Sequence, residues 1–283
     1  MIKLAIQKSG RLNKESLELI KDCGVNFEIY RDQLKVISKN YPIEIYFLRN
    51  GDIPKYLNDG VVDLAIVGEN TLNEKNYQLN IIEKLGFSKC RISVAVPKDF
   101  KYESVDDLNN IRIATSYPNT LKKFLKKEGV KSDLHIINGS VEISPSMGLA
   151  DAICDIVSSG STLFENNLVE VVTLFESQAV LVQSNNVKKD LYSEINNLVF
   201  RIRSVLLAKK FKYILMNAPN KSINKISKIL PVLKSPTVLP LAKDGWSSIH
   251  SVIDYEDFWN IIDMLKKEGA EDILVCPIEK MVL

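Results

Sequence analysis

The fold of this chain is decided by the segment Glu142-Ile-Ser-Pro-Ser-Met-Gly-Leu-Ala-Asp151-Ala-Ile-Cys-Asp155-Ile-Val-Ser-Ser-Gly-Ser-Thr-Leu163. Its apolar residues 153–157 predict a short buried strand. The small residues that follow predict a turn that opens into a helix near Leu163; they are Ser158, Ser159, Gly160, Ser161 and Thr162. Backbone N–H groups at a helix start, together with hydroxyl side chains, can bind an anion such as a phosphate. The segment therefore indicates a β/α fold with an anion-binding turn at the end of a strand.

Two carboxylates, Asp151 and Asp155, lie four residues apart just before this turn. Asp155 falls inside an apolar strand, where an ionised side chain is costly unless polar groups bind it. Ribose hydroxyl groups would serve that purpose, so the pair is predicted to hold a ribose whose phosphate lies in the turn. For the turn alone, a strand-to-helix connection without a ligand is the simpler interpretation. Glu142, at the head of the segment, is predicted either to contact the substrate or to fix the loop.

Strands and helices alternate on both sides of this segment, which indicates α/β layers. The strands are expected at residues 2–7, 43–48, 64–67, 91–96, 111–115, 134–137, 153–157, 169–174 and 177–183. Helices are expected at residues 12–23, with Asn13 as N-cap, around residues 53–57 with Asp52 as cap, at 120–128 and at 191–208. The pattern predicts two similar halves with a cleft between them.

The rhythm changes over the last 75 or so residues of the chain. Strands are expected at residues 213–216, 237–241, 247–253 and 273–276, and helices at 223–230 and 258–267. The order βαββαβ is that of a ferredoxin-like domain. Small domains of this plan often sense ligands, and a purely structural dimerisation module is the alternative.

Cationic residues follow the first two predicted strands directly. Lys8, Gly10 and Arg11 come after the first strand, and Arg49 comes after the second. Because a small molecule binds at the carboxyl ends of strands in such folds, these side chains are expected at one rim of the cleft. Arginine and lysine suit a pyrophosphate there, and Gly10 allows a close backbone approach. Solvated surface charge is the alternative.

Two further residues follow predicted strands. Glu69, in Gly68-Glu69-Asn70, could take part in a magnesium shell or hold its loop by hydrogen bonds. Tyr117 is placed either to stack on a purine or to cover the core. Both are predicted to contact a nucleotide.

Composition restricts the possible partners and location. The 283 residues carry 37 basic and 35 acidic side chains, a balance that favours neither nucleic acid nor an anionic membrane as partner. Apolar runs are too short for a membrane span, and the first strand is too short for a signal peptide, so a cytoplasmic location is expected. The four cysteines are scattered singly and only two histidines are present, which argues against a zinc site or disulfides.

Taken together, several blocks of the chain resemble the ATP phosphoribosyltransferase family, and they occur in family order over nearly the full length. Besides residues 142–163, the blocks are Gln7-Lys8-Ser9-Gly10-Arg11-Leu12, Asp59-Gly60-Val61-Val62-Asp63-Leu64, Gly68-Glu69-Asn70, Thr115-Ser116-Tyr117-Pro118, Ser235-Pro236-Thr237-Val238-Leu239-Pro240-Leu241 and Pro277-Ile278-Glu279-Lys280-Met281. The last block is similar to the C-terminal segment of the long form of the family. Members of that form carry a C-terminal regulatory domain.

The resemblance implies that the 5-phosphoribosyl group of 5-phosphoribosyl 1-pyrophosphate is transferred to N1 of the ATP adenine, with Mg²⁺ and release of pyrophosphate. It implies that Lys8, Arg11 and Arg49 stabilise the pyrophosphate while Asp151 and Asp155 hold the ribose. It also implies inhibition by histidine, bound in the C-terminal domain, for which Thr237 and Asn217 are the candidate contacts. A homo-oligomer is expected, formed by dimers that assemble into hexamers.

The expected fold is α/β: two β/α lobes of periplasmic-binding-protein-like type form a catalytic cleft, and a ferredoxin-like domain follows. Residues 1–90 with 178–208 are expected to form the first lobe, 91–177 the second, and 209–283 the regulatory domain. A solute-binding protein has similar lobes, but it would need an export signal, which the first residues do not lead us to expect. A ligand sensor without catalysis would leave the Asp151/Asp155 segment without a role.

Overall fold

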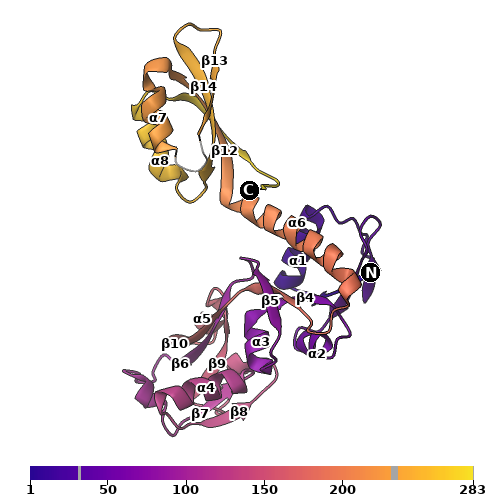
Figure 1. Ribbon diagram of the computed structural model, residues 1–283. Helices are drawn as coiled ribbons and strands as arrows, with labels where there is room; N and C mark the ends of the chain where they lie inside the picture. The colour runs from indigo at the N-terminus through magenta and orange to yellow at the C-terminus, as the bar shows by residue number, and fades with distance from the viewer. Residues whose placement is uncertain (31–32, 231–234, 283) are drawn as a thin grey trace. The chain divides into compact units, whose positions relative to one another are not determined.

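The structure is a computed structural model that describes residues 1–30, 33–230 and 235–282. It divides into two compact units, each described here by itself. One unit comprises Met1–Lys21 and Val25–Ile195, and the other comprises Asp22–Gly24 and Asn196–Leu283. The first unit contains two β-sheets with their helices, which we call the first and the second lobe (Figure 1).

The first lobe is built on a six-stranded sheet of order β2-β3-β1-β4-β11-β5. Its strands are β1 (Ile2–Gln7), β2 (Lys35–Ile37), β3 (Ile43–Leu48), β4 (Leu64–Gly68), β5 (Asn80–Lys84) and β11 (Ala179–Gln183), and its helices are α1 (Arg11–Asp22), α2 (Ile53–Asn58) and α3 (Glu69–Lys75). Every residue of β4 is buried, as expected for an uninterrupted apolar strand covered on both faces. Since β1 runs parallel to β3 and β4, the carboxyl ends of these three strands share one sheet edge.

The second lobe is built on a five-stranded sheet of order β10-β6-β9-β7-β8. Its elements are β6 (Cys90–Pro97), η1 (Val105–Leu108), β7 (Arg112–Thr115), α4 (Pro118–Glu128), β8 (Asp133–Ile136), η2 (Val141–Ile143), β9 (Ala152–Val157), α5 (Ser161–Glu165) and β10 (Leu168–Ser177). The side chains of Leu121 and Leu125 on α4 pack with Ile92, Ile113 and Cys154 of the sheet in one buried cluster. The strands β7, β8 and β9 are parallel, so the residues that follow β7 and β9 lie at the same edge.

The two lobes have the same strand order. In the first lobe β3-β1-β4 is followed by the antiparallel strand β11 and then by β5; in the second, β8-β7-β9 is followed by the antiparallel strand β6 and then by β10. In both sheets the antiparallel strand is the one that the chain forms directly after crossing from the other lobe. The two similar halves and the fold class predicted from the sequence are therefore confirmed.

The second unit contains the C-terminal domain and the long helix from Asn196 onward, while the start of that helix and the 3-10 turn before it belong to the first unit. The 3-10 helix η3 (Lys189–Leu191) precedes α6 (Tyr192–Lys210), and then come β12 (Phe211–Pro219), η4 (Asn220–Ser222), α7 (Ile223–Ile229), β13 (Thr237–Pro240), β14 (Trp246–Asp254), α8 (Phe258–Lys267) and β15 (Glu271–Pro277). The four-stranded antiparallel sheet has the order β13-β14-β12-β15, and α7 and α8 cover one of its faces (Figure 1). The predicted βαββαβ arrangement is confirmed, with Ile214, Ile226, Ile249 and Leu265 in its core.

The structure corrects several local predictions. Helix α1 begins at Arg11, so Asn13 is not an N-cap; its side-chain amide donates to the carbonyl of Gln7 at 2.6 Å. The reason is Gly10, whose φ of +88° turns the chain directly from β1 into the helix. Asp52 occupies the N-cap position of α2, but its side chain makes no capping hydrogen bond. The short elements β2, β5 and α3 were not predicted.

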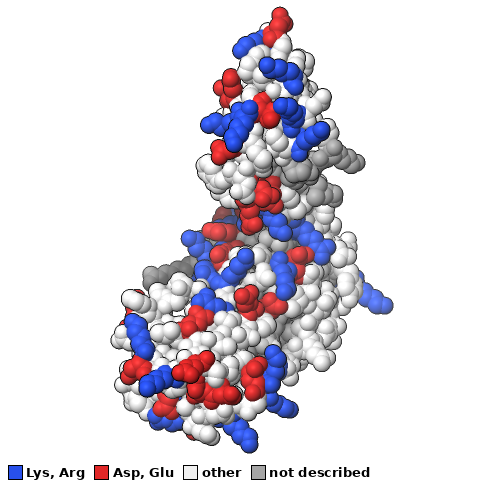
Figure 2. All heavy atoms as spheres, turned by 90° about the vertical axis from the view of Figure 1, so that its left-hand side faces the viewer, with Lys and Arg blue, Asp and Glu red and all other residues white. Residues whose placement is uncertain are grey.

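Charge and hydropathy of the described residues agree with the composition. On the face drawn in Figure 2, Lys and Arg side chains are interspersed with Asp and Glu side chains. None of the helices formed by the described residues has both the length and the apolar character that crossing a membrane requires.

Candidate active site

The turn after β9 forms a pocket of about 330 Å³. It brings together seven of the residues singled out in the sequence: Glu142, Asp155, Ser158, Ser159, Gly160, Ser161 and Thr162. Gly160 takes a φ of +84°, which turns the chain from the strand into α5. The hydroxyl groups of Ser159 and Ser161 lie 3.0 Å apart, at the start of that helix. We call residues 158–162 the cradle.

Asp155 lies at the carboxyl end of β9 beside the cradle. Burial, together with the smaller effect of the nearby negative charge of Glu142, raises the pKa of its carboxyl group from 3.8 to about 6. Both carboxyl groups line the same pocket. A ligand that donates hydrogen bonds to Asp155, or that carries positive charge, would therefore be stabilised there.

Asp151 does not join Asp155 in the pocket. It lies at the amino end of β9, where Oδ1 accepts from Nη2 of Arg112 at 2.7 Å and Oδ2 accepts from its Nε and backbone N at 3.1 and 2.9 Å. These hydrogen bonds lower the pKa of the Asp151 carboxyl group. Because a strand advances roughly 3.3 Å per residue, the α-carbons of Asp151 and Asp155 are about 13 Å apart. The structure thus separates the two carboxylates that the sequence places side by side.

Arg11 reaches across from the first lobe to the cradle. Its Nη1 donates to Oγ of Ser158 at 3.1 Å, and its Nη2 donates to the backbone carbonyl of Lys89 at 2.9 Å. Nε of Arg11 also lies 3.8 Å from the carboxylate of Glu15. The guanidinium group is therefore held at the boundary between the two lobes, next to the cradle.

Lys8 and Arg49 occupy the same sheet edge of the first lobe, as predicted. The backbone N of Lys8 donates to the carbonyl of Leu48 at 2.8 Å, which places the two cationic residues after neighbouring strands. Both side chains are exposed and make no hydrogen bond or ion pair with the part of the chain that the structure describes. Gly10 lies beside them with its α-hydrogen near the Gln7 side chain; a Cβ at position 10 would lie 3.3 Å from Nε2 of Gln7.

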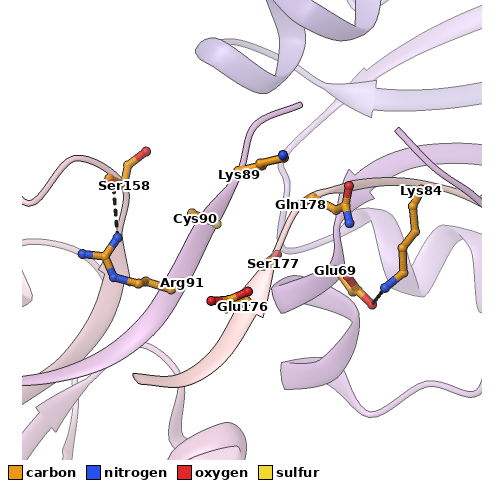
Figure 3. A pocket seen from close by; sticks show the side chains of 9 residues that line it. All are labelled: Glu69, Lys84, Lys89, Cys90, Arg91, Ser158, Glu176, Ser177 and Gln178. Atoms are coloured by element: carbon orange, nitrogen blue, oxygen red, sulfur yellow. Dashed lines mark hydrogen bonds and ion pairs between the residues drawn. The ribbon is translucent and has the colours of Figure 1, made fainter. Parts of the chain in front are cut away.

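A second pocket, of about 480 Å³, adjoins the cradle and shares Ser158 with it (Figure 3). On one side Arg91 points toward Ser158 and donates to its backbone carbonyl at 3.3 Å. On the other side the carboxylate of Glu69 meets Nζ of Lys84 at 3.5 Å. Lys89, Cys90, Glu176, Ser177 and Gln178 complete the lining. Sequence reasoning missed Lys89 and Arg91, although both lie where the chain enters the second lobe, a position that their strand boundary indicates.

Tyr117 follows β7 and packs against the core of the second lobe. Its hydroxyl group accepts a hydrogen bond from Nδ2 of Asn70, on α3 of the first lobe, at 3.2 Å. Burial raises the pKa of the Tyr117 hydroxyl, and the charge of Asp155 adds to this effect. The ring therefore covers the core of the second lobe, and its hydroxyl group contacts the first lobe.

The side chains present suit a metal ion that arrives with a ligand. The described residues contain no group of three or more His, Cys, Asp or Glu side chains arranged to hold a metal ion. Asp155 and Glu142 are the carboxylates of the cradle pocket. Mg²⁺ prefers octahedral oxygen ligands and keeps several waters, so phosphate oxygens would have to supply most of its remaining coordination.

Thr237 and Asn217 lie on one face of the C-terminal sheet. Thr237 is exposed and pairs with His250, and Asn217 pairs with Ser248, two residues along on the same strand β14. This face is the one opposite the core residues of β12. Nδ2 of Asn217 donates to Oδ2 of Asp272 at 3.0 Å, so its amide already has a partner within the domain.

A hydroxyl-rich cradle beside a half-buried carboxylate, at the edge of a two-lobed α/β unit, is typical of an enzyme that binds a sugar phosphate. Comparison with protein families makes this specific. The model of ATP phosphoribosyltransferase matches residues 49–204, and the model of the HisG C-terminal domain matches residues 208–280. The chain belongs to the ATP phosphoribosyltransferase family, and it is an enzyme of histidine biosynthesis with the regulatory domain of that family.

Individual relatives agree with this assignment over the full length. The chain is 50% identical over 282 residues to an ATP phosphoribosyltransferase of Cytophaga hutchinsonii, covering 100% of this chain and 99% of that protein. It is 48% identical to one of Bacteroides thetaiotaomicron, with both chains covered completely. Among solved structures, the ATP phosphoribosyl transferase (HisG:HisZ) complex from Thermotoga maritima is similar at a TM-score of 0.63 and 30% identity, covering 72% of this chain and 96% of that chain.

Proposed function

We propose that this enzyme transfers the 5-phosphoribosyl group of 5-phosphoribosyl 1-pyrophosphate to N1 of the ATP adenine at the cradle after β9, and releases pyrophosphate. The reaction follows from the family, and the observation that supports this location is the pocket in which Asp155, Glu142 and residues 158–162 meet. The product is the first intermediate of histidine biosynthesis, and the C-terminal domain provides feedback inhibition by histidine.

The cradle is proposed to bind the 5′-phosphate. Ser158, Ser159, Ser161 and Thr162 offer hydroxyl donors, and Gly160 leaves the backbone open to a phosphate oxygen. Hydrogen bonds to a charged group contribute roughly 1.5–3 kcal/mol each, so a few of them suffice to hold a sugar phosphate. Glu142, which also lines the pocket, is proposed to border the ribose.

Asp155 is proposed to accept hydrogen bonds from the ribose hydroxyl groups and to favour positive charge on the ring. Displacement at an anomeric carbon passes through a transition state with oxocarbenium character, which a nearby carboxylate stabilises. Asp151 is no longer proposed to contact the ribose, because both its carboxylate oxygens accept hydrogen bonds from Arg112 at the amino end of the strand. We propose that Asp151 fixes strands β7 and β9 relative to each other.

The leaving pyrophosphate is proposed to lie between the lobes, near Lys8, Arg11 and Arg49. Arg11 already contacts Ser158, and the two other cations have no partner among the described residues that would compete for a phosphate. Mg²⁺ bound to the pyrophosphate would neutralise part of its charge. Adenine N1 carries a free lone pair, so the reaction needs no general base; positioning and charge stabilisation carry it.

ATP is proposed to occupy the pocket of Figure 3. Its cationic side chains Lys84, Lys89 and Arg91 suit a triphosphate, and its contact with Ser158 places it next to the cradle. Glu69, which we predicted to contact the nucleotide, lines this pocket. Tyr117 is proposed to border the adenine site through its hydroxyl edge, since its ring packs on the core.

We infer three domains from the sheets and the family matches. Residues 1–90 with 178–208 would form the first lobe, 91–177 the second and 209–283 the regulatory domain; the contacts of the structure group α6 from Asn196 onward with the regulatory domain. Thr237 and Asn217 are proposed to contact histidine. Dimers that assemble into hexamers, and a cytoplasmic location in keeping with four free cysteines, complete the proposal.

One assay tests the proposed activity. The purified protein is mixed with ATP, 5-phosphoribosyl 1-pyrophosphate and Mg²⁺, and the absorbance of the phosphoribosylated adenine is followed. An increase that requires all three components and stops on addition of histidine is expected. Absence of product with both substrates present would contradict the assignment.

A further inference from the structure

Helix α4 of the second lobe is capped by a side chain of the first lobe. Its N-cap residue, Tyr117, makes no side-chain capping hydrogen bond, and Pro118 at the first helical position has no N–H. The next two N–H groups are bound by Glu74 of α3: Asn119 N donates to Oε1 at 2.9 Å, and Thr120 N donates to Oε2 at 2.8 Å. Leu121 N then makes the first intrahelical bond, to the carbonyl of Tyr117 at 3.0 Å.

More hydrogen bonds surround this cap. The Thr120 hydroxyl donates to Oε2 of Glu74 at 2.9 Å, and Nδ2 of Asn119 donates to the backbone carbonyl of Glu74 at 3.0 Å. Asn73 adds a bond from its Nδ2 to the Thr120 hydroxyl at 3.3 Å. Glu74 is only 8% exposed, so its carboxylate depends on these donors for stabilisation. Figure 1 shows α3 and α4 side by side.

The capped end of α4 is linked to the candidate active site. The backbone N of Tyr117 donates to the Thr115 hydroxyl at 2.8 Å, and that hydroxyl donates to the carbonyl of Cys154 at 2.7 Å. Cys154 directly precedes Asp155 on β9. A shift of α4 relative to α3 would therefore displace the strand end that carries Asp155.

We propose that Glu74 is a positioning residue for the transfer reaction. By capping α4 from the first lobe, it sets the orientation in which the cradle and Asp155 of the second lobe face Lys8, Arg11 and Arg49 of the first. The two substrates are then aligned by a protein contact that touches neither of them. This inference rests on the proposed function, since it assigns the reacting groups to the two lobes.

The test compares Glu74→Gln with a matched control in the full-length enzyme. The amide keeps the side chain's shape but puts an NH₂ group opposite an N–H donor. The control is Asp107→Asn, because Asp107 also accepts two backbone N–H groups, of Glu103 at 2.7 Å and Ser104 at 2.9 Å, but within the second lobe. Amide hydrogen exchange of the ligand-free protein should become faster at residues 117–123 in Glu74→Gln and at residues 103–108 in Asp107→Asn.

Kinetics then separate positioning from stability. Well below the melting temperature, Glu74→Gln should lower kcat at least tenfold, whereas binding of ribose 5-phosphate, measured by calorimetry, should change less than threefold because the cradle pocket lies wholly in the second lobe. Asp107→Asn should change kcat and the affinity for ribose 5-phosphate by no more than twofold each. Faster exchange with unchanged kcat would show that the cap serves stability alone, and unchanged exchange would show that the cap is not formed; either result overturns the proposal.

A second variant covers the case that Glu74→Gln does not fold. Thr120→Val removes one hydrogen-bond donor to Glu74 and keeps the backbone hydrogen bonds. As in Glu74→Gln, kcat should decrease, here by about threefold or more. An unchanged kcat in Thr120→Val, with faster exchange at residues 117–123, would equally overturn the proposal. Failure of the proposed function is recognised separately, since the unmodified enzyme would then form no product while the exchange experiment remains valid.

Discussion

Arg11 of the first lobe donates a hydrogen bond of 3.1 Å to the Ser158 hydroxyl of the second lobe, across 147 positions of sequence. The same guanidinium group binds the carbonyl of Lys89, where the chain passes between the lobes. Arg11 thus connects the cradle to the first lobe, and Ser158 is common to both pockets. The predicted pyrophosphate contact is therefore placed beside the predicted phosphate cradle.

Arg11→Ala is expected to weaken binding of the phosphoribosyl donor. It removes the contact with Ser158 and a charge beside the pyrophosphate, so the apparent affinity for that substrate should fall about tenfold, as expected for one lost charge-assisted hydrogen bond. Steady-state kinetics with each substrate varied in turn measure this. Lys14→Ala is the control, since Lys14 is a cation on the same helix. Equal kinetics in both variants would remove Arg11 from the site.

Lys8 and Arg49 are expected to bind free pyrophosphate. Each single alanine variant should raise the inhibition constant of pyrophosphate several-fold, because one cation near a phosphate is lost while the fold keeps its buried contacts. Product-inhibition measurements at two salt concentrations give the constants, and the difference between variant and unmodified enzyme should shrink at high salt. Unchanged inhibition in both variants would place the leaving group elsewhere.

Asp155 should determine the acid limb of the pH profile. Its pKa of about 6 means that the carboxyl group is neutral below that pH and charged above it. Since charge on Asp155 is proposed to favour the transition state, kcat/KM should fall as the pH is lowered through about 6. Asp155→Asn should have a low kcat/KM at every pH, and its kcat/KM should not decrease further as the pH is lowered through about 6. A variant that keeps the limb would assign it to another group.

The same pKa gives an opposite effect on stability. The folded state binds a proton more tightly than the unfolded chain, whose carboxyl group has a pKa of about 3.9, so the free energy of unfolding decreases as the pH rises from about 4 to about 6. At neutral pH the burial of this charge costs on the order of 2–3 kcal/mol. Asp155→Asn should therefore melt at an equal or higher temperature than the unmodified enzyme at a pH of about 7.5, while being far less active. Early melting with normal activity would make Asp155 structural.

Asp151→Asn should show the reverse pattern. Its pKa is lowered by Arg112, so its contribution to stability is present above the unfolded value and is lost as the pH falls through the folded value. At neutral pH the variant should melt earlier, because Arg112 loses its charged partner, while turnover and the apparent affinity for each substrate should stay within about twofold. Thermal unfolding followed by kinetics checks both. A large loss of kcat without a change in melting temperature would instead support the predicted contact of Asp151 with the ribose.

Thr237→Val is expected to weaken feedback inhibition. The change removes a hydroxyl group from the exposed face of β13 and keeps the strand, so basal turnover should persist while the histidine concentration for half inhibition rises several-fold. Ser227→Ala is the control, because that hydroxyl bonds within α7 to the carbonyl of Ile223. Calorimetry with histidine measures binding directly. Equal affinity in both variants would exclude Thr237.

Much of the architecture was predictable because it depends on local patterns. The uninterrupted apolar run of β4 and the alternation of β12 each reveal a strand from a few neighbouring residues. The cradle could also be found this way, because its small residues and Asp155 are consecutive or nearly so in the chain. The short strands β2 and β5 could not be predicted in this way. Their residues are largely exposed, and they gain stability only by pairing with β3 and β11.

By itself, the sequence determined the alternation of strands and helices, the cradle and the family, because each of these depends on residues that are close together in the chain. The tertiary structure decided which charges meet. Asp151 and Asp155 look equivalent in the chain, but an extended strand carries them to opposite sheet edges, where Asp151 finds Arg112. Glu74 meets Thr120, and Arg11 meets Ser158, only because the chain crosses twice between two sheets. Such contacts depend on strand order and packing, which no local spacing of residues specifies.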